Sequence, residues 1–294
     1  MSFAADSRTD GARPRPRGAL GRLMSEPMGA TGAVLVALFI AVALFAPLIA
    51  PYDPLALDIP AKLQGPSLAH PAGTDQLGRD TLSRLIYGAR TALAIAMGAT
   101  GAAGVIGLAL GMMAGYGPRW LDGALMLVLD SLASLPMILF ALAVITVLGP
   151  SATTLVFVII LVSISGYARL VRAQTLGLAN AEFIQAERTM GASNLRILFR
   201  HLMPNVVGPL LIVLSMDVPV VIMLEAGLSY LNLGIRPPVP SWGNILYDGY
   251  SSLRQQPALV IAAGVPLVLS TIGFTFLGEG LRDALDPRLK GGGP

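Results

Sequence analysis

The stretch MGATGAVLVALFIAVALFAPLIA, residues Met28–Ala50, contains no charged side chain. A helix that crosses the hydrocarbon core of a bilayer needs about 20 apolar residues, so this stretch is long enough to span a membrane. It exceeds the core of a typical signal peptide, which has about 7 to 15 apolar residues. Pro51 also follows the most plausible small-residue cleavage position. We therefore expect an uncleaved membrane anchor.

The rest of the chain is as apolar as this first stretch. Of its 294 residues 54% are hydrophobic and only 13% are charged, whereas soluble domains have about 25% charged residues. The mean hydropathy is +0.70. Five further spans are predicted at roughly Thr91–Gly115, Ala124–Leu148, Thr153–Arg172, Val206–Tyr230 and Pro257–Leu277. The predicted fold class is an all-α integral membrane protein with six transmembrane helices.

Six spans place both ends of the chain on one side of the membrane. Most of the 20 Lys and Arg residues fall on that side. The exceptions are Lys62, Arg79, Arg84, Arg90, Arg236 and Arg254. Because cytoplasmic loops carry an excess of Lys and Arg, both termini are predicted to be cytoplasmic. The net charge of +3 is then explained by the arginine excess that sets the membrane topology, and nucleic-acid binding is not expected.

Several kinds of chemistry are excluded by residues that the chain lacks. It has no cysteine, and its two histidines are too far apart for a zinc-protease motif. Its two lysines, Lys62 and Lys290, follow Ala61 and Leu289, so no phosphate-binding loop can be written. The nucleophile motif G-x-S-x-G is also absent. We expect no catalytic residue, no metal site and no enzyme activity in this chain, and any ATP chemistry must come from another polypeptide.

These patterns divide the chain into four parts. Residues 1–26 are expected to be a disordered cytoplasmic tail, because Arg, Gly, Pro and Ser dominate them. Residues 27–90 contain the first span and an outer segment. Residues 91–289 form the core transmembrane domain with a cytoplasmic loop at 174–205, and residues 290–294 are a short tail.

The cytoplasmic loop contains AEFIQAERTMGASNLRILFRHLMPN, residues Ala181–Asn205, which predicts two short amphipathic helices. In the first, an apolar stripe is expected from Phe183, Ile184, Ala186 and Met190. Gly191 suits a left-handed helix cap, Ser193 caps the second helix, and Pro204 is expected to end it. The residues alone allow two interpretations: an amphipathic helix pair that lies on the lipid surface, or a projecting segment that binds another protein.

QAERTMG, then nine residues, then HLMP has the form E-A-A-x-x-x-G-x(9)-I-x-L-P. It resembles the loop of membrane subunits in bacterial binding-protein-dependent ABC importers, which docks on the ATP-hydrolysing subunit. Gln185 stands for the acidic residue, Glu187 for the second alanine, and His201 and Met203 for the isoleucine and leucine. The residues matched to this loop, and implied to couple transport to ATP hydrolysis, are Phe183, Gln185, Ala186, Glu187, Arg188, Met190, Gly191 and Pro204.

Further blocks are similar to the dipeptide and oligopeptide permeases of the C type. They are GTDQLGRDTLSRLIYGAR (Gly73–Arg90), GYARLVRA (Gly166–Ala173), RHLMPN (Arg200–Asn205), EAGLSYLNLG (Glu225–Gly234), PPVPSWG (Pro237–Gly243) and LGEGLRDALDPRL (Leu277–Leu289). Asn232 departs from the family's usual glycine, and Leu127 stands where an arginine is common.

The resemblance implies a type I importer permease of the bacterial inner membrane. Its implied partners are a homologous permease subunit, two ATP-binding subunits that hold ATP and magnesium, a solute-binding protein and the lipid bilayer, with no cofactor in this chain. Peptides are the implied substrate, and nickel, glutathione or another small solute remains an alternative.

Three carboxylates, Asp130, Asp217 and Glu225, lie within or near the ends of predicted spans. A carboxylate in a membrane costs about 2.5 to 3.5 kcal/mol on insertion scales, so it usually faces a cavity or a partner. They are candidates for the translocation path, and structural roles are the alternative. A proton-coupled secondary transporter that uses Asp217 and Glu225 as relay groups is the competing function. Trp242 is expected to be an interfacial anchor, or else a contact for the solute-binding protein.

Overall fold

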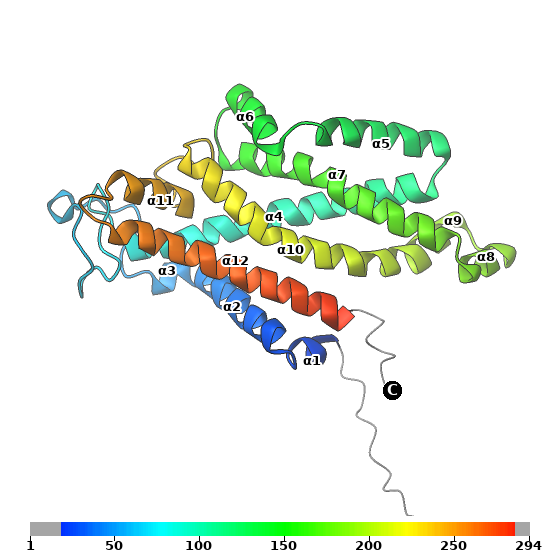
Figure 1. Ribbon diagram of the computed structural model, residues 1–294, viewed down its shortest axis with the longest axis horizontal. Helices are drawn as coiled ribbons and strands as arrows, with labels where there is room; N and C mark the ends of the chain where they lie inside the picture. Colours follow the sequence, from blue (N-terminus) through cyan, green and yellow to red (C-terminus); the bar gives the residue numbers. More distant parts are fainter. Residues whose placement is uncertain (1–18, 286–294) are drawn as a thin grey trace, which may run out of the picture.

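The computed structural model describes residues 19–285, which fold into helices and connecting loops (Figure 1). The long helices are α2 (Pro27–Leu44), α4 (Thr81–Tyr116), α7 (Ala152–Ala179), α10 (Met203–Tyr230) and α12 (Ala258–Leu285). The shorter elements are α1 (Ala19–Leu23), α3 (Ala46–Ile49), η1 (Ile59–Ala61), α5 (Arg119–Ala133), α6 (Met137–Leu148), α8 (Glu182–Thr189), α9 (Asn194–Arg196), η2 (Ile197–Leu202) and α11 (Trp242–Ser251). Within the described range no strand forms, and Thr74 and Asp80 make one isolated bridge.

Five helices in the described range are long and apolar enough to cross a bilayer. Helices α5 and α6 pass the same test together but meet at an angle of 86°. Counted as one span, this bent pair brings the total to six, so the predicted fold class is confirmed. The continuous span predicted at Ala124–Leu148 is wrong, because the chain breaks at Ser134–Pro136 and Pro136 has no N–H to continue the helix.

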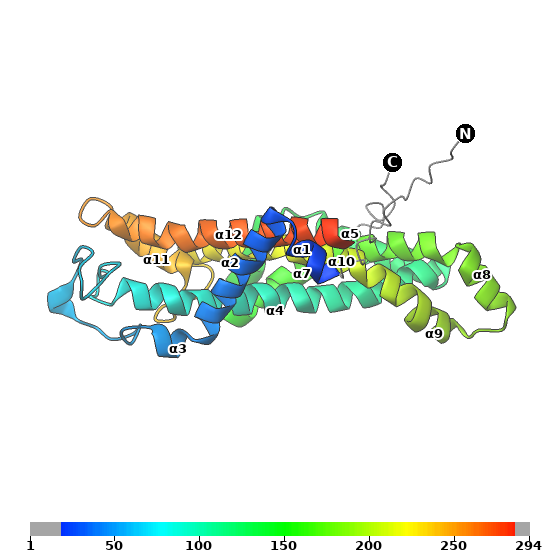
Figure 2. The same ribbon diagram turned by 90° about the horizontal axis from the view of Figure 1, so that it is seen from below.

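The long helices lie side by side along the length of the molecule (Figures 1 and 2). Helix α2 crosses α12 and α4 obliquely, and α5 and α6 lie beside α7 at the opposite edge. One end carries α11 and the loop between α3 and α4, and the other end carries α8 and α9. By the charge asymmetry of the sequence, the α11 end is the outer end and the α8 end is cytoplasmic.

Glycines on one face of α4 allow α7 to approach closely. They recur every fourth residue, at Gly107, Gly111 and Gly115. A Cβ atom added to Gly111 would lie 2.5 Å from the carbonyl oxygen of Ala168 and 2.6 Å from the Val171 Cβ atom. Lipid gives no hydrophobic drive between helices, so close packing of this kind is what holds membrane helices together.

A second glycine contact joins the first span to the last. A Cβ atom on Gly32 would overlap the backbone nitrogen of Leu277, and one on Gly280 would lie 2.5 Å from the Gly29 Cα atom. Helix α2 therefore packs against α12 at backbone distance, and the first span is part of the bundle.

The helix boundaries differ from the expected ones at both ends of the outer segment. The expected tail 1–26 is helical in part, because α1 places Leu23 against Gly29 and Gly280. Residues 1–18 and the expected tail 290–294 lie outside the described residues. At the other end, α4 begins at Thr81, earlier than the predicted start at Thr91, because the Asp80 carboxylate accepts a hydrogen bond from the Ser83 N–H at 2.7 Å.

Gly111→Leu is expected to separate α4 from α7 and to lower the free energy of unfolding by about 1 to 3 kcal/mol, as overpacking does. Gly98 is the matched control, because no atom lies within 4 Å of an added Cβ atom there. The measurement is the thermal unfolding midpoint of the detergent-purified protein. Equal midpoints for Gly111→Leu and Gly98→Leu would contradict the packing described here.

Candidate functional site

The cytoplasmic end of the molecule carries a bent segment, residues 181–203, which we call the elbow. Gly191 has φ +83°, the left-handed conformation predicted for this position. An added Cβ atom would meet nothing within 4 Å, so the backbone conformation, and not a lack of space, requires glycine. The Ser193 side chain accepts a hydrogen bond from the Arg196 N–H at 3.3 Å, which confirms the predicted cap of the second helix.

A small apolar core attaches the elbow to the bundle. Its fully buried side chains are Ile184, Ile197 and Leu202, and Tyr116 and Leu178 pack against them. Of the expected stripe on α8 only Ile184 is buried, so the stripe is corrected. Helix α8 has only about two turns and packs against the bundle through Ile184 alone. Its other apolar side chains therefore face outward.

The outward surface of the elbow is consequently apolar in several places. Met190 is 73% exposed at the bend, and Phe183, Leu195 and Phe199 are exposed beside it on α8, α9 and η2. Gln185 and Ala186 are exposed on α8 as well. Large apolar side chains gathered on one projection are typical of a surface that binds a protein or a membrane.

Polar contacts brace the elbow from within the same chain. The Glu187 Oε1 atom lies 3.4 Å from His201 Nε2. The Arg188 guanidinium lies over the Tyr116 ring, 5.4 Å from its centroid, and the Tyr116 hydroxyl donates to Asn194 Oδ1 at 3.0 Å. Glu187 therefore makes a contact in its own chain, and Arg188 keeps an exposed side.

Pro204 does not end the second helix. The chain runs from α9 through η2, a π-helical turn, directly into α10. A proline ring in a regular helix would clash with the carbonyl four residues earlier, and a π turn widens the spacing at that point. The elbow is therefore continuous with the fifth span.

Two ion pairs join α5 to α7 near the cytoplasmic end. Arg172 Nη2 lies 2.6 Å from Asp122 Oδ2, and Arg169 Nη1 lies 3.5 Å from Asp130 Oδ1. Asp130 thus has a partner from α7, although its own helix offers Leu127 one turn earlier. Both carboxylates pair with cations of the same chain, and the Asp130 pair is the longer and more exposed of the two.

Glu225 on α10 is completely buried at the outer end of the bundle. The hydroxyls of Ser229 and Ser241 each donate to its Oε1 atom at 2.7 Å. Ser241 also accepts from the Gly243 N–H at the start of α11, at 3.2 Å. Glu225 links α10 to α11, and this enclosure favours the structural alternative over a place in the path.

Asp217 is in a different situation, at the middle of α10 and only partly buried. It lies near the Tyr167 side chain of α7, and Ser163 and Thr100 are close to the same hydroxyl, which makes no hydrogen bond within the described part of the chain. Polar side chains from α4, α7 and α10 therefore meet halfway along the bundle. Of the three expected carboxylates, Asp217 alone is both central and accessible.

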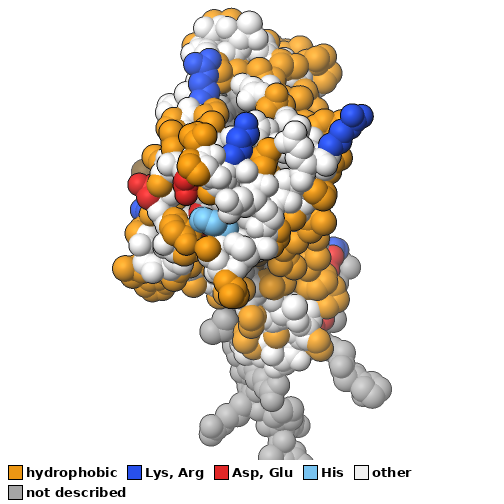
Figure 3. All heavy atoms as spheres, turned by 90° about the vertical axis from the view of Figure 1, so that its left-hand side faces the viewer, with side chains coloured by type: hydrophobic (Ala, Val, Ile, Leu, Met, Phe, Trp, Pro, Cys, Tyr) orange, Lys and Arg blue, Asp and Glu red, His pale blue; other side chains and the backbone are white. Residues whose placement is uncertain are grey.

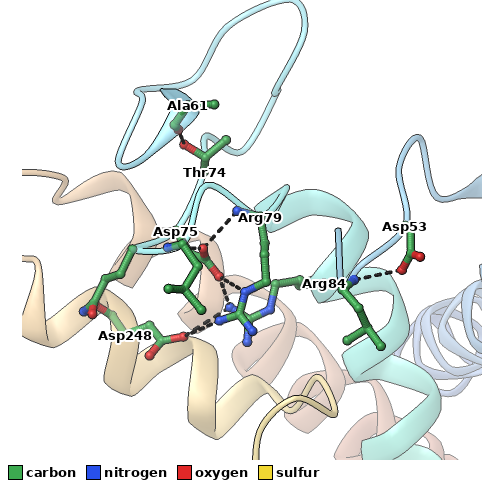
Figure 4. A network of polar contacts seen from close by, with 10 residues as sticks. Asp53, Ala61, Thr74, Asp75, Arg79, Arg84 and Asp248 are labelled. Atoms are coloured by element: carbon green, nitrogen blue, oxygen red, sulfur yellow. Dashed lines mark hydrogen bonds and ion pairs between the residues drawn. The ribbon is translucent and has the colours of Figure 1, made fainter. Parts of the chain in front are cut away.

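The outer end is held together by a buried ionic network (Figure 4). The Asp75 carboxylate accepts hydrogen bonds from Arg79 Nε, at 2.7 Å, and from Arg84 Nη1. Arg84 Nη1 also lies 3.1 Å from Asp248 Oδ2 on α11. Gly73 and Gly78, which flank Asp75 in this loop, both have positive φ, the left-handed conformation that glycine adopts in turns.

Sequence reasoning missed the link to α11. The sequence did contain an indication of special roles for Arg79 and Arg84, because both lie on the side of the membrane where Lys and Arg are depleted. The other outer cations, Lys62, Arg90, Arg236 and Arg254, are all exposed, and Figure 3 shows Lys and Arg side chains apart from one another on the outer face.

Trp242 is neither an interfacial anchor nor a contact for another protein in this structure. It is fully buried, its Nε1–H donates to the Leu85 carbonyl at 3.0 Å, and its ring meets that of Phe39 edge-on at 5.9 Å. The expectation was wrong because the proline-rich stretch before Trp242 leads inward, where Gly88 leaves room for the indole.

Comparison with known sequences gives two family matches. The profile of binding-protein-dependent transport system inner membrane components matches residues 107–291, and that of the N-terminal transmembrane domain of oligopeptide transport permease C matches residues 17–66. The dipeptide transport system permease protein DppC of Alkalihalophilus pseudofirmus is 36% identical over 93% of this chain and 90% of its own length. The glutathione transport system permease protein GsiD of Escherichia coli O157:H7 is 40% identical over 92% of this chain and 89% of its own length.

Among solved structures, the inward-facing MetNI methionine ABC transporter has a similar fold. The TM-score is 0.57 at 18% identity, and the match covers 70% of this chain and 98% of that one. At this identity the likeness concerns the fold alone.

Asp75→Asn is expected to leave Arg79 and Arg84 without their shared carboxylate and to lower the free energy of unfolding by about 3 to 5 kcal/mol. Asp58→Asn, an exposed change in the same loop, is the control. Thermal unfolding of the purified protein measures the difference, and limited proteolysis after α11 reports its detachment. If Asp75→Asn unfolds like the control, the network does not hold the outer end.

Proposed function

Because the chain belongs to the binding-protein-dependent transport system inner membrane components, of the oligopeptide permease C type, we propose that its elbow couples transport to ATP hydrolysis on a partner subunit. A permease of this family is a multi-pass subunit of an ABC importer in the inner membrane. It works with an ATP-hydrolysing subunit and a solute-binding protein. The chemistry of ATP therefore belongs to the partner, and the permease supplies the path.

The exposed apolar tip of the elbow carries this proposal. Phe183 and Met190 extend away from the bundle, while Ile184 and Ile197 fix the segment to it from inside. A partner that binds Phe183 and Met190 removes their apolar surface from water, at about 25 cal/mol per Å². Arg188 and Gln185 border that surface with polar groups.

Motion of the elbow reaches the membrane through the continuous helical stretch that follows the bend, Asn194–Tyr230. The elbow runs through η2 into α10, and the Arg188 and Asn194 contacts with Tyr116 join it to the end of α4. A nucleotide bound to the partner shifts the pore between inward-facing and outward-facing states only if the partner grips the elbow differently in the two states. Helices α4 and α10 carry the shift to the middle of the bundle.

The translocation path is proposed to pass Asp217. Asp217 is partly accessible and is grouped with Tyr167 and Thr100 at the middle of the bundle. Intramembrane carboxylates usually face a cavity or a partner, and no cation pairs with Asp217 among residues 19–285. The pore would be completed by a second, homologous permease, which makes the transmembrane unit a heterodimer.

The proposed substrate is a di- or oligopeptide. The dipeptide permease of A. pseudofirmus supports it, and the glutathione permease of E. coli supports glutathione, itself a small peptide, as the alternative. Nickel or another small solute is the remaining candidate. Specificity in such a system lies largely in the solute-binding protein, so this chain offers a polar path more than a selective pocket.

Met190→Cys is expected to form a crosslink with the ATP-hydrolysing subunit, because the side chain is exposed at the tip and the native chain has no other cysteine. Leu253→Cys, exposed at the outer end, is the matched control and should give no such crosslink. The product is identified by mass spectrometry of the assembled transporter. Reaction of Met190→Cys only with lipid-borne probes would support the alternative of an elbow resting on lipid.

Gly191→Val is expected to reduce uptake while ATP turnover continues, since a side chain in the left-handed conformation costs about 1 to 2 kcal/mol and a β-branched one is a clear outlier. Gly191→Asn tolerates that conformation and should transport nearly normally. Uptake of a dipeptide, glutathione and nickel into proteoliposomes is measured against ATP hydrolysed. Full coupling in Gly191→Val, or uptake that follows a proton gradient without ATP, would refute the proposal.

A further inference from the structure

A groove on the membrane-facing side of the bundle runs between α2 and α4. The part nearer the outer end of the bundle, which we call the upper part, has a volume of about 290 Å³. It is lined by Ile40 and Leu44 of α2 and by Arg90 and Met97 of α4. The lower part, about 430 Å³, shares Ile40 and Met97 and continues to Gly101. The two parts therefore adjoin at Ile40 and Met97, along the side of the bundle.

The walls of the groove are almost purely apolar. Side chains of α2, α4, α10 and α12 line its lower part, and only Thr100 and Ser215 carry a polar group there. The Ser215 hydroxyl is already satisfied, because it donates to the Ile212 carbonyl at 2.7 Å. The lower part therefore suits a hydrocarbon chain better than a peptide.

Arg90 is the one charged residue that lines either part. It is exposed, and no carboxylate of the described residues forms an ion pair with it. It lies beside Leu44, at the outer end of α2, where the first span reaches the membrane surface. Lipid headgroups are expected at this end of the span, and arginine binds phosphate through paired N–H donors.

The length of the groove matches one leaflet. From Arg90 to Gly101 the rise along α4 is about 16 Å, at 1.5 Å per residue. The hydrocarbon core of a bilayer is about 30 Å thick, so half of it is about 15 Å. A chain that starts at Arg90 therefore ends near Gly101, at the middle of the membrane.

From this geometry we propose that the groove is a binding site for one phospholipid of the outer leaflet. The phosphate binds Arg90, and one acyl chain lies along Ile40 and Met97 and reaches Gly101. The lipid occupies the cavities that lie beside the place where α2 crosses α4 obliquely (Figure 2). It adds to the contact between the first span and the core, which α2 otherwise makes mainly with α12 through Gly29 and Gly32.

The test uses the whole transporter reconstituted in vesicles that contain a phosphatidylethanolamine with a photoreactive acyl chain. Labelled peptides of α2, α4 and α10 are counted by mass spectrometry. Arg90→Gln is expected to lower labelling of the groove by about fivefold, because one basic side chain at the membrane surface contributes roughly that factor. Arg236→Gln removes an exposed outer cation away from the groove and should leave labelling unchanged.

A second pair of variants tests the chain-binding half of the site. Gly101→Phe should fill the lower groove and abolish labelling there, because an added Cβ atom meets no atom within 4 Å and the fold tolerates it. Gly98→Phe adds the same side chain on the same helix outside the groove and is the control. Labelling that stays unchanged in both Arg90→Gln and Gly101→Phe would overturn the proposal, because ordinary contact with bulk lipid predicts that result. A disulfide from Met97→Cys to a cysteine on the second permease would also overturn it, because that subunit would then occupy the groove.

Discussion

The lack of water in the bilayer core constrains every feature of this molecule. Backbone N–H and C=O groups must pair within their own segment, so the spans are helices, and lipid gives those helices little reason to associate. The structure meets this constraint with glycine faces. Gly111 lets α4 reach the backbone of α7, and Gly32 and Gly280 do the same for α2 and α12. The rest of the architecture depends on these close contacts.

Several charged side chains of the bundle lie where they form ion pairs or hydrogen bonds. At the outer end, Asp75 neutralises two arginines and Asp248 ties α11 to them, so a charged network replaces close packing outside the membrane. Glu225 fastens α11 to α10 through two serine hydroxyls. Within the described spans, Asp217 alone among the three candidate carboxylates is both central and accessible, and this contrast supports the proposed path past Asp217.

The elbow combines rigidity with exposure. Its inner residues are buried as completely as those of the main core, its bend is set by a left-handed glycine, and it continues into α10 without a break. A projection anchored in this way suits the proposed coupling, because its second helix runs directly into α10. The exposed Phe183 and Met190 are stabilised only when something covers them, which is the property that a docking surface needs.

The amino-acid sequence by itself determined the class of fold, the approximate spans, the orientation and the family. Those features depend on local composition and spacing, such as the neutral run before Pro51 and the distance from Gly191 to Pro204. Only the tertiary structure decided that Trp242 is buried, that Asp130 pairs with Arg169, that Pro204 continues a helix and that Arg84 reaches Asp248. Each of these joins segments far apart in the chain or depends on the local path of the backbone. Such contacts follow from how the helices pack in three dimensions, and no local pattern of residues encodes them.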